Sequence, residues 1–310
     1  MRQIAAERTK LTAVKPSVAK KRALSIKKDW KSLILLIPFF VCLYLTLWRP
    51  TINGFIYSLF KLQGYTPVKF VGFQNYIAVL RDTIFLTALA NSLKYVFWSF
   101  VLGYLPPLII AIIMNEMVRF KGLMRFSVYL PVMVPAMSAS LIWYLLYNPT
   151  NIGALNIVLA KLGAPPFAWL ENSTFVIPLI VMSLTWKAYG STCLLYQATL
   201  QGVNQSLYEA AKIEGANAWQ RIKVVQLPHL SGVMMLFAVN QVIGVFQIME
   251  QPLAMTGGGP NNASITLSLQ GYHYGFTYFQ TEKALALGVV IFMILMVLTS
   301  FYFRLDKSKG

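Results

Sequence analysis

The chain has 310 residues, of which 57% are hydrophobic and only 12% are charged. A soluble domain usually carries roughly 25% charged residues, so this composition excludes a soluble globule of ordinary surface. It also excludes a disordered chain, collagen and a disulfide scaffold. The two cysteines, Cys42 and Cys193, lie in apolar runs, which is typical of small buried residues rather than of a disulfide or a metal pair. We therefore expect an all-α membrane protein.

Six apolar runs are long enough to cross a bilayer, whose core of about 30 Å requires roughly 20 helical residues. They are predicted at residues 32–48, 95–114, 126–147, 175–197, 230–249 and 284–303. The first run is the shortest, but no small-residue cleavage pattern follows it, so we interpret it as a retained span. Proline inside a spanning helix permits a kink, which is predicted for three runs at Pro106-Pro107, at Pro131 with Pro135, and at Pro178, with a role in packing geometry alone as the alternative.

Lysine and arginine are distributed unevenly between the two sides of this predicted arrangement. The segments 1–31, 115–125, 198–229 and 304–310 hold 19 of the 27 Lys and Arg residues, which places them in the cytoplasm with both termini inside. The predicted layout is a basic cytoplasmic tail (1–31), a six-helix transmembrane domain (32–303) and a short cytoplasmic tail (304–310). A basic segment before a membrane helix is typical of contact with anionic lipid, and no motif for nucleic acid accompanies it.

Several kinds of chemistry are missing from the sequence. It contains no phosphate-binding loop for ATP and no His-Glu-x-x-His zinc motif, and its two histidines, His229 and His273, are predicted on opposite membrane faces. No Asp or Glu falls within a predicted span, which argues against an ion-coupled carrier and a membrane hydrolase. Two classes remain: a passive channel or scaffold, and one subunit of a machine that another chain powers.

The cytoplasmic loop 204–228 favours the second class. Ser206 followed by Glu209 predicts a capping box that starts a helix, and Gly215 suits the left-handed residue that ends it. A second helix then runs up to Leu227-Pro228. One stripe of the first helix is predicted to carry Leu207, Ala210, Ala211 and Glu214. A rigid two-helix unit whose small residues allow close approach is suited to transmitting a partner's motion to the membrane helices.

These residues resemble the EAA loop of the membrane subunits of ABC importers, although that family usually has Asp at position 214 and an aromatic at position 222. The resemblance implies that the loop contains the coupling helix that inserts into an ATPase subunit. The coupling residues that it implies are Ser206, Glu209, Ala210, Ala211, Glu214, Gly215, Leu227 and Pro228. The reading that Glu209 is only a helix cap remains open at this point.

Three further segments are similar to the carbohydrate-specific branch of that family, the maltose and glycerol-phosphate type: 71–76, Asn91-Ser92, and 256–260 with Thr266. The resemblance implies a type I ABC importer permease fold, a sugar or oligosaccharide substrate, and no enzymatic activity or cofactor in this chain. Its implied partners are a second permease chain, two ATPase subunits that hold ATP and Mg²⁺, and an extracytoplasmic solute-binding protein. The implied location is a bacterial or archaeal plasma membrane. A non-sugar solute, such as a polyamine or phosphodiester, is the alternative within the family.

The fourth and fifth predicted spans bring polar and aromatic side chains to similar depth in the membrane. Sugars require aromatic faces for their C–H surfaces and amides for their hydroxyl groups. The candidate substrate-path residues are Trp186, Lys187, Tyr189, Asn240, Gln241 and Gln247. Hydrogen bonding between helices is the alternative for Asn240 and Gln241, and pairing with a sister subunit is the alternative for Lys187.

Overall fold

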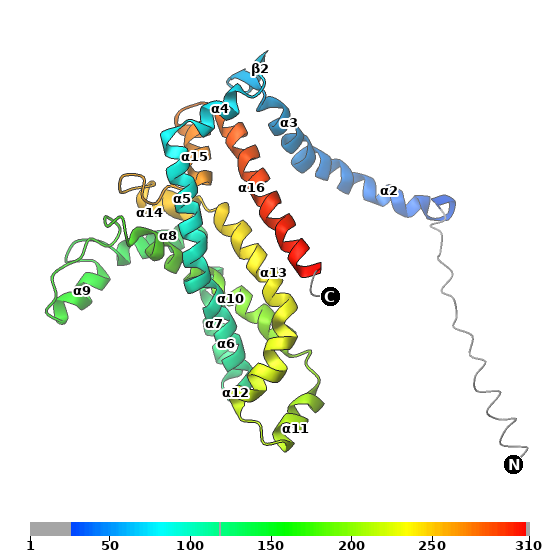
Figure 1. Cartoon of the computed structure of the whole chain (residues 1–310), viewed down its shortest axis with the longest axis vertical. Coiled ribbons are helices and arrows are strands. Elements are labelled where there is room, and N and C mark those ends of the chain that lie inside the picture. The colour runs from blue at the N-terminus through cyan, green and yellow to red at the C-terminus, as the bar shows by residue number, and fades with distance from the viewer. Residues whose placement is uncertain (1–25, 118, 308–310) are drawn as a thin grey trace, which may run out of the picture. The chain divides into compact units, whose positions relative to one another are not determined.

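The computed structural model describes residues 26–117 and 119–307. The chain divides into two compact units, residues 1–53 and 54–310. The described part of the first unit is helical and consists of α2 (Ile26–Leu43), the π-helical turn η1 (Tyr44–Trp48) and the start of α3 (Arg49–Tyr57) (Figure 1). Most of the predicted basic tail, residues 1–25, lies outside the described residues, as do residues 308–310 of the second tail.

A small hairpin stands near the start of the second unit. Its strands β1 (Phe60–Gln63) and β2 (Thr66–Phe70) pair antiparallel, and α4 (Gln74–Leu80) follows. The amide of Asn75 donates hydrogen bonds to the carbonyl oxygens of Ser58 (2.8 Å) and Phe60 (2.9 Å), and the hydroxyl groups of Tyr76 and Ser58 lie 2.6 Å apart. The segment 71–76 thus holds the hairpin against α4.

The remaining elements follow in chain order. The first half contains α5 (Thr83–Trp98), the π-helical turn η2 (Ser99–Tyr104), α6 (Leu105–Glu116), α7 (Lys121–Tyr129), the 3₁₀ turn η3 (Leu130–Met133), α8 (Ala136–Leu146), α9 (Ala154–Lys161) and α10 (Val176–Leu200). The second half contains α11 (Gln205–Ile213), α12 (Ala218–Arg221), the π-helical turn η4 (Ile222–Gln226), α13 (Leu227–Phe246), α14 (Glu250–Thr256), α15 (Leu267–Tyr272), the π-helical turn η5 (His273–Thr277) and α16 (Thr281–Lys307).

Among the described residues, four helical segments are long and apolar enough to cross a membrane: Ile34–Tyr57, Thr83–Glu116, Ala218–Phe246 and Thr281–Ser300. A fifth is a pair of helices, Lys121–Met133 and Ala136–Leu146, bent by 96°. The break lies at Val134 and Pro135, so the kink predicted in the third run is present. The proline has no N–H to donate, and it turns the residue before it to extended backbone, with ψ 130° at Val134.

The fourth predicted span corresponds to α10, which has 25 residues but a less uniformly apolar sequence. Lys187 and several hydroxyl residues interrupt it. Ten of its side chains are buried in the protein, and it packs on α5, α6, α8 and α13. Because other helices cover so much of its surface, α10 does not need the apolar exterior that contact with lipid would require.

Three π-helical turns immediately precede prolines that lie in helices. They are η1 before Pro50, η2 before Pro106-Pro107, and η4 before Pro228. Proline lacks the N–H that would bond four residues back, and its ring clashes with that carbonyl group. Widening the preceding turn accommodates the ring without ending the helix. The predicted second helix therefore continues through Leu227-Pro228 into α13.

Close packing of α10 depends on one glycine. A Cβ atom built on Gly190 would lie 2.2 Å from the carbonyl oxygen of Val128 at the end of α7. Small residues let helix backbones approach closely in membranes, where packing and hydrogen bonds replace the hydrophobic effect as the force that joins helices. Gly190 therefore fixes the spacing between α10 and the α7–η3 segment.

Candidate functional site

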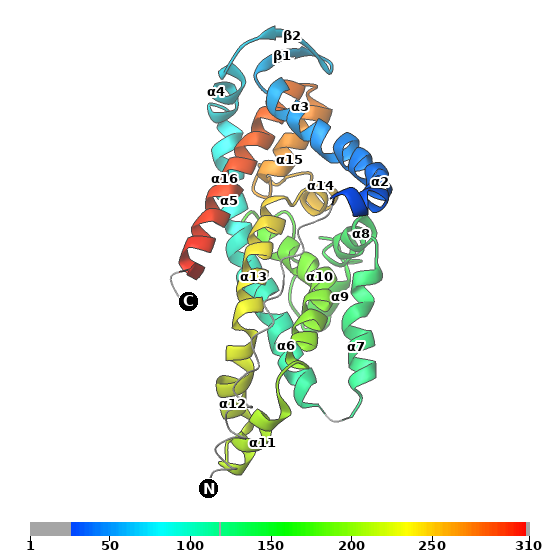
Figure 2. The same cartoon turned by 90° about the vertical axis from the view of Figure 1, so that its right-hand side faces the viewer.

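At one end of the second unit, α11 and α12 form a two-helix unit (residues 204–221), at the opposite end from β1 and β2 (Figure 2). The connection between α6 and α7 lies toward the same end. The segments 115–125 and 198–229, which the charge distribution predicted on one side, are therefore neighbours. The two-helix unit extends beyond the long helices.

The start of α11 differs from its prediction. The N-cap is Asn204, whose side chain accepts a hydrogen bond from the backbone N–H of Ser206 at 3.0 Å. The predicted capping box of Ser206 and Glu209 is therefore wrong, because the helix begins one residue before Ser206. A capping box does occur in α12, where Asn217 and Gln220 exchange side-chain and backbone hydrogen bonds of 2.7 and 2.9 Å.

The end of α11 agrees with its prediction. Gly215 has a φ of +77°, the left-handed conformation. The N–H of Ala216 donates to the carbonyl oxygen of Ala211 (2.9 Å), and the N–H of Gly215 donates to that of Lys212 (3.1 Å). This pair of bonds is a Schellman motif, which satisfies carbonyl groups at a helix end. A Cβ atom at Gly215 would meet no atom within 4 Å, so only backbone conformation demands glycine there.

One side of α11 faces the protein and the other is open. Tyr208 and Ala211 pack against the buried cluster around Met114 and Val225, whereas Glu209, Ala210 and Glu214 are exposed. Large apolar side chains are exposed on the same unit: Leu207 (54%), Ile213 (87%) and Trp219 (61%). Of the predicted stripe, only Ala211 is partly buried. The rest forms a surface where small and apolar residues are available to a partner.

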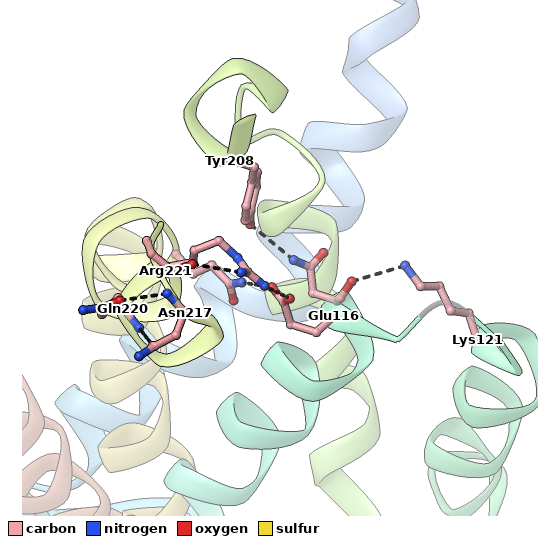
Figure 3. Close-up of polar contacts among 9 residues, drawn as sticks. Glu116, Lys121, Tyr208, Asn217, Gln220 and Arg221 are labelled. Carbon is pink, nitrogen blue, oxygen red and sulfur yellow. Dashed lines mark hydrogen bonds and ion pairs between the residues drawn. The ribbon is translucent and has the colours of Figure 1, made fainter. Parts of the chain in front are cut away.

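The unit is attached to α6 through Glu116 and Asn115 (Figure 3). Arg221 donates from Nη2 to Glu116 Oε2 at 2.9 Å, and Gln226 donates from Nε2 to Glu116 Oε1 at 2.6 Å. The amide of Asn115 donates to the Tyr208 hydroxyl at 3.3 Å, and Lys121 donates to the Asn115 carbonyl oxygen at 3.2 Å. Burial raises the pKa of Tyr208, which therefore stays neutral.

A polar cavity of about 580 Å³ separates α11 from α6 around these contacts. It is lined in part by Asn115, Lys121, Tyr208, Lys212 and Arg221. Beside this cavity, α11 is held to the long helices by the packing of Tyr208 and Ala211 on the buried cluster and by the hydrogen bond from Asn115 to Tyr208, while the ion pair of Arg221 holds α12. Sequence reasoning missed Glu116 and Arg221, although Glu116 falls at the predicted inner end of the second span. Leu227, half-buried, and Pro228, exposed, lie at the start of α13 and not in the two-helix unit itself.

A second candidate site is the α10–α13 cavity, an opening of about 450 Å³ between α10, α13, η2 and α14. Four predicted substrate-path residues line it: Tyr189, Asn240, Gln241 and Gln247. The amide of Gln241 donates to the Ser99 carbonyl oxygen at 3.5 Å, and a Cβ atom at Gly103 would lie 3.0 Å from that amide nitrogen. Gly103 thus makes room for Gln241 at the cavity wall.

Trp186 and Lys187 lie on other faces of α10. The ring of Trp186 packs edge to face against Trp143 of α8, with centroids 6.0 Å apart. The α10 residues that line the cavity include Thr185, Ala188 and Thr192, at helical spacing with Tyr189. Sequence reasoning also missed Glu250 and Gln251, which line the cavity from the start of α14. The sequence contains no periodic pattern that predicts the path of α14 beside the cavity.

The wall next to the cavity is fixed by hydrogen bonds between distant segments. Asn91 of α5 donates to the carbonyl oxygens of Asn262 (2.8 Å) and Ile265 (3.1 Å). Thr256 and Ser264 hydroxyl groups lie 2.7 Å apart across the glycine segment, and Thr266 donates to the Ile248 carbonyl oxygen at 2.7 Å. Segment 256–266 is therefore a pinned loop rather than a free turn. Its residues hold α14 in place beside the cavity.

Within the described residues, no group of three or more His, Cys, Asp or Glu side chains is arranged to hold a metal ion. The two described histidines, His229 and His273, lie on separate elements, at α13 and η5. The chemistry that the two sites offer is hydrogen bonding and surface contact.

Residues 99–309 match the family model described as "Binding-protein-dependent transport system inner membrane component". The arabinooligosaccharides transport system permease protein AraP of Bacillus subtilis (strain 168) is 31% identical over 95% of this chain and 96% of its own length. The trehalose/maltose transport system permease protein MalF of Thermococcus litoralis is 29% identical, with 89% and 93% covered. The sn-glycerol-3-phosphate transport system permease protein UgpA of Escherichia coli O157:H7 is 31% identical, with 81% and 86% covered.

Solved structures share the fold. A chain of a bacterial ABC transporter involved in the import of the acidic polysaccharide alginate superposes with a TM-score of 0.83 at 22% identity, over 91% of this chain and 97% of that one. A chain of the alginate transporter in complex with alginate pentasaccharide-bound periplasmic protein gives a TM-score of 0.82 at 21% identity, over 91% and 96%. The family match, the relatives and the fold agree. The chain belongs to the inner-membrane components of binding-protein-dependent transport systems, in the maltose and glycerol-phosphate type branch of ABC importer permeases, and is a multi-pass transport subunit rather than an enzyme.

Proposed function

We propose that this chain forms half of the translocation pathway of an ATP-driven importer for a sugar or oligosaccharide. The substrate class is supported by two of the three named relatives, the permease proteins for arabinooligosaccharides and for trehalose and maltose. It is also supported by the α10–α13 cavity, whose amides and Tyr189 ring suit hydroxyl groups and C–H faces. In this proposal Tyr189, Asn240, Gln241 and Gln247 contact the substrate, while Trp186 and Lys187 act through neighbouring helices or a sister subunit.

The observation that carries the coupling role is the two-helix unit. It extends from the end of the long helices, exposes Glu209, Ala210 and Glu214, and is attached to α6 through Glu116. A partner that binds this surface can move α6 and α13 together. Arg221 of α12 and Gln226, the residue before α13, both bond to Glu116 of α6. We assign the ATPase-docking role to Ser206, Glu209, Ala210 and Glu214, a structural role within the two-helix unit to Ala211 and Gly215, and a structural role at the start of α13 to Leu227 and Pro228.

The assembly that follows from this proposal has four kinds of component. Two ATPase subunits bind ATP and Mg²⁺ and dock on the two-helix unit of this chain and on its counterpart. A second, related permease chain supplies the other half of the pathway. An extracytoplasmic solute-binding protein delivers the sugar, as supported by the family description and by the binding protein present in the alginate complex.

The proposed topology has six spans, with α10 and the bent α7–α8 segment as two of them and both termini in the cytoplasm. The domain layout is the basic tail (1–31), the transmembrane domain (32–303) with the coupling loop (204–228), and the tail (304–310). The membrane is the plasma membrane of a bacterium or archaeon. The excess of Lys and Arg in the segments beside the two-helix unit supports this orientation.

A photo-crosslinking experiment on the intact complex tests the docking assignment. A benzophenone amino acid replaces Ala210 on the exposed face of α11, and a matched variant carries it at the exposed residue Asn261 on the pinned loop. The expected result is an adduct with the ATPase subunit from position 210 and none from position 261. An ATPase adduct of equal yield from both positions, or from 261 alone, would contradict the assignment.

A further inference from the structure

The α10–α13 cavity is lined by polar side chains but by charge of one sign only. Its described lining contains four amide side chains and several hydroxyl groups, but only one side chain with a formal charge at neutral pH, the carboxylate of Glu250. No Lys, Arg or His is among the described residues that line it. The charge therefore has one sign, although the whole chain carries a net charge of +17.

Among the described residues, no side chain of this chain forms an ion pair with that carboxylate. Within the described part of the chain, the one ion pair closer than 4.0 Å joins Arg221 to Glu116 at the two-helix unit. Lys187, the one cation in α10, lies outside the cavity lining. The negative charge of Glu250 is thus available to act on a solute that enters the cavity.

We infer that Glu250 is a specificity-determining residue that favours uncharged polyhydroxy solutes over anionic ones such as uronates and sugar phosphates. A carboxylate accepts hydrogen bonds from sugar hydroxyl groups, as do the neighbouring amide oxygens. Against an anion the same carboxylate is repulsive, and low-dielectric walls around a cleft strengthen its field. Discrimination of this kind arises from an unfavourable contact with the wrong solute as much as from a good one with the right solute.

This inference rests on the proposed function and deepens it. Both solved structures reported above are transporters of alginate, an acidic polysaccharide. Fold similarity at 22% identity carries no information on the charge that the cavity accepts. The start of α14, where Glu250 lies, is held beside the cavity by the pinned loop through the hydrogen bond from Thr266 to Ile248, so the backbone that carries this carboxylate lies near the solute path.

The first test measures the sign of the cavity's potential directly. In the full complex, with Cys42→Ser and Cys193→Ala, a single cysteine replaces Thr192 on the cavity lining. It is modified with methanethiosulfonates of similar size, one bearing trimethylammonium and one bearing sulfonate, and rates are normalised to a free thiol in solution. With Glu250 present, the cation is expected to react about tenfold faster than the anion, and with Glu250→Gln the ratio is expected to fall to within about twofold.

A matched control places the cysteine at Leu195, an exposed residue of α10 outside the cavity lining. Its rate ratio is expected to be the same with Glu250 and with Glu250→Gln. The inference is overturned if the Thr192 ratio does not change on Glu250→Gln, or if it changes no more than the Leu195 ratio does.

The second test measures selection during transport. Two solutes that both bind the solute-binding protein, a neutral sugar and its uronate analogue, compete for uptake by the reconstituted complex. Because the binding protein is identical in both variants, its own preference cancels, and Glu250→Gln is expected to shift uptake toward the uronate by about threefold or more. An unchanged uptake ratio in complexes that do import the neutral sugar overturns the inference alone. Absence of sugar uptake by the unaltered complex contradicts the proposed function instead.

Discussion

Arg221 and Glu116 lie 105 residues apart in the chain and form an ion pair of 2.9 Å at the junction of the two-helix unit with α6. Their side chains are 16% and 32% exposed, so water screens the pair only in part. Gln226 bonds to the second oxygen of the same carboxylate at 2.6 Å. Glu116 therefore links α6 to both α12 and η4.

Reversing one charge of this pair should uncouple the importer. We expect Glu116→Arg to bring two cations together, to loosen the two-helix unit from α6, and to reduce sugar-stimulated ATPase activity by roughly fivefold or more at unchanged subunit abundance. Groups in one charge network show interaction free energies of about 0.5–3 kcal/mol, so the double change Glu116→Arg with Arg221→Glu should restore a large part of the stimulation. Equal defects in the single and double variants would contradict this role.

Gly215 should be essential for its backbone conformation and not for its size. A residue with a Cβ atom in the left-handed region costs roughly 1–2 kcal/mol, and a β-branched one is the least tolerated there. We expect Gly215→Val to abolish most of the stimulated ATPase activity, and Gly215→Asn to retain much of it because Asn adopts this conformation more readily. The same valine at Gly232, a helical position with open space and no positive φ, serves as the control and should leave stimulation intact.

Sequence reasoning identified local features of the coupling loop and missed its attachments. The left-handed conformation of Gly215 was predictable because it depends only on residue types and backbone hydrogen bonds within residues 211–216. The cap at Asn204 was missed because Ser206 is an equally good cap by residue type, and only the true start of α11 distinguishes them. The bonds of Glu116 to Arg221 were beyond reach, since they depend on how α6 and α12 approach each other.

The same distinction applies to the cavity. Depth along a helix can be predicted from a sequence, and Tyr189, Asn240 and Gln241, which it grouped with Trp186 and Lys187, line one cavity. The direction of each side chain around the helix axis is not fixed by depth, so Trp186 was grouped with Tyr189 although it packs on Trp143. Glu250 follows directly on the predicted fifth span (230–249), and the sequence does not show the path of α14 that brings it to the cavity.

The cavity assignment predicts a difference between neighbouring positions. Removing the amide of Asn240 by Asn240→Ala should cost about 0.5–1.5 kcal/mol of substrate contact, which is roughly a threefold to tenfold loss in apparent affinity for transport. Trp186→Ala should instead lower thermal stability through the lost Trp143 contact. Leu195→Ala, on an exposed face of α10, should change neither. Uptake titrations at matched expression measure the affinities, and normal affinity in Asn240→Ala would remove it from the substrate path.

The close approach at Gly190 predicts a sensitive position in the centre of the fold. Gly190→Ala places a methyl carbon 2.2 Å from the Val128 carbonyl oxygen, so α10 and α7 must separate. Overpacking of this kind costs about 1–3 kcal/mol, and we expect a lower melting temperature of the detergent-solubilised complex. Gly288→Ala, at an open position in α16, is the control and should melt as the unaltered protein does. Equal melting of the two variants would mean that the helices are not packed this closely.

The proposed topology is tested by labelling from each side of the membrane. In the background with Cys42→Ser and Cys193→Ala, single cysteines are introduced at Ser206 in α11 and at Asn261 in the pinned loop, both exposed. A reagent that does not cross membranes should label Ser206→Cys from the cytoplasmic side alone and Asn261→Cys from the outside alone. Labelling of Asn261→Cys from the cytoplasm would invalidate the orientation and the span count.

The contact between Asn91 and the pinned loop has a consequence for biogenesis. Asn91 is almost completely buried, and the carbonyl groups that receive its two hydrogen bonds belong to residues 171 and 174 positions later in the chain. While the ribosome is still producing α6 to α13, α5 therefore resides in the membrane with an amide that has not met its final acceptors, an arrangement that costs free energy in an apolar medium. A chain that stops before residue 265 lacks one or both of these acceptors, so we expect α5 to be less stably packed in such a truncated chain than in the full one.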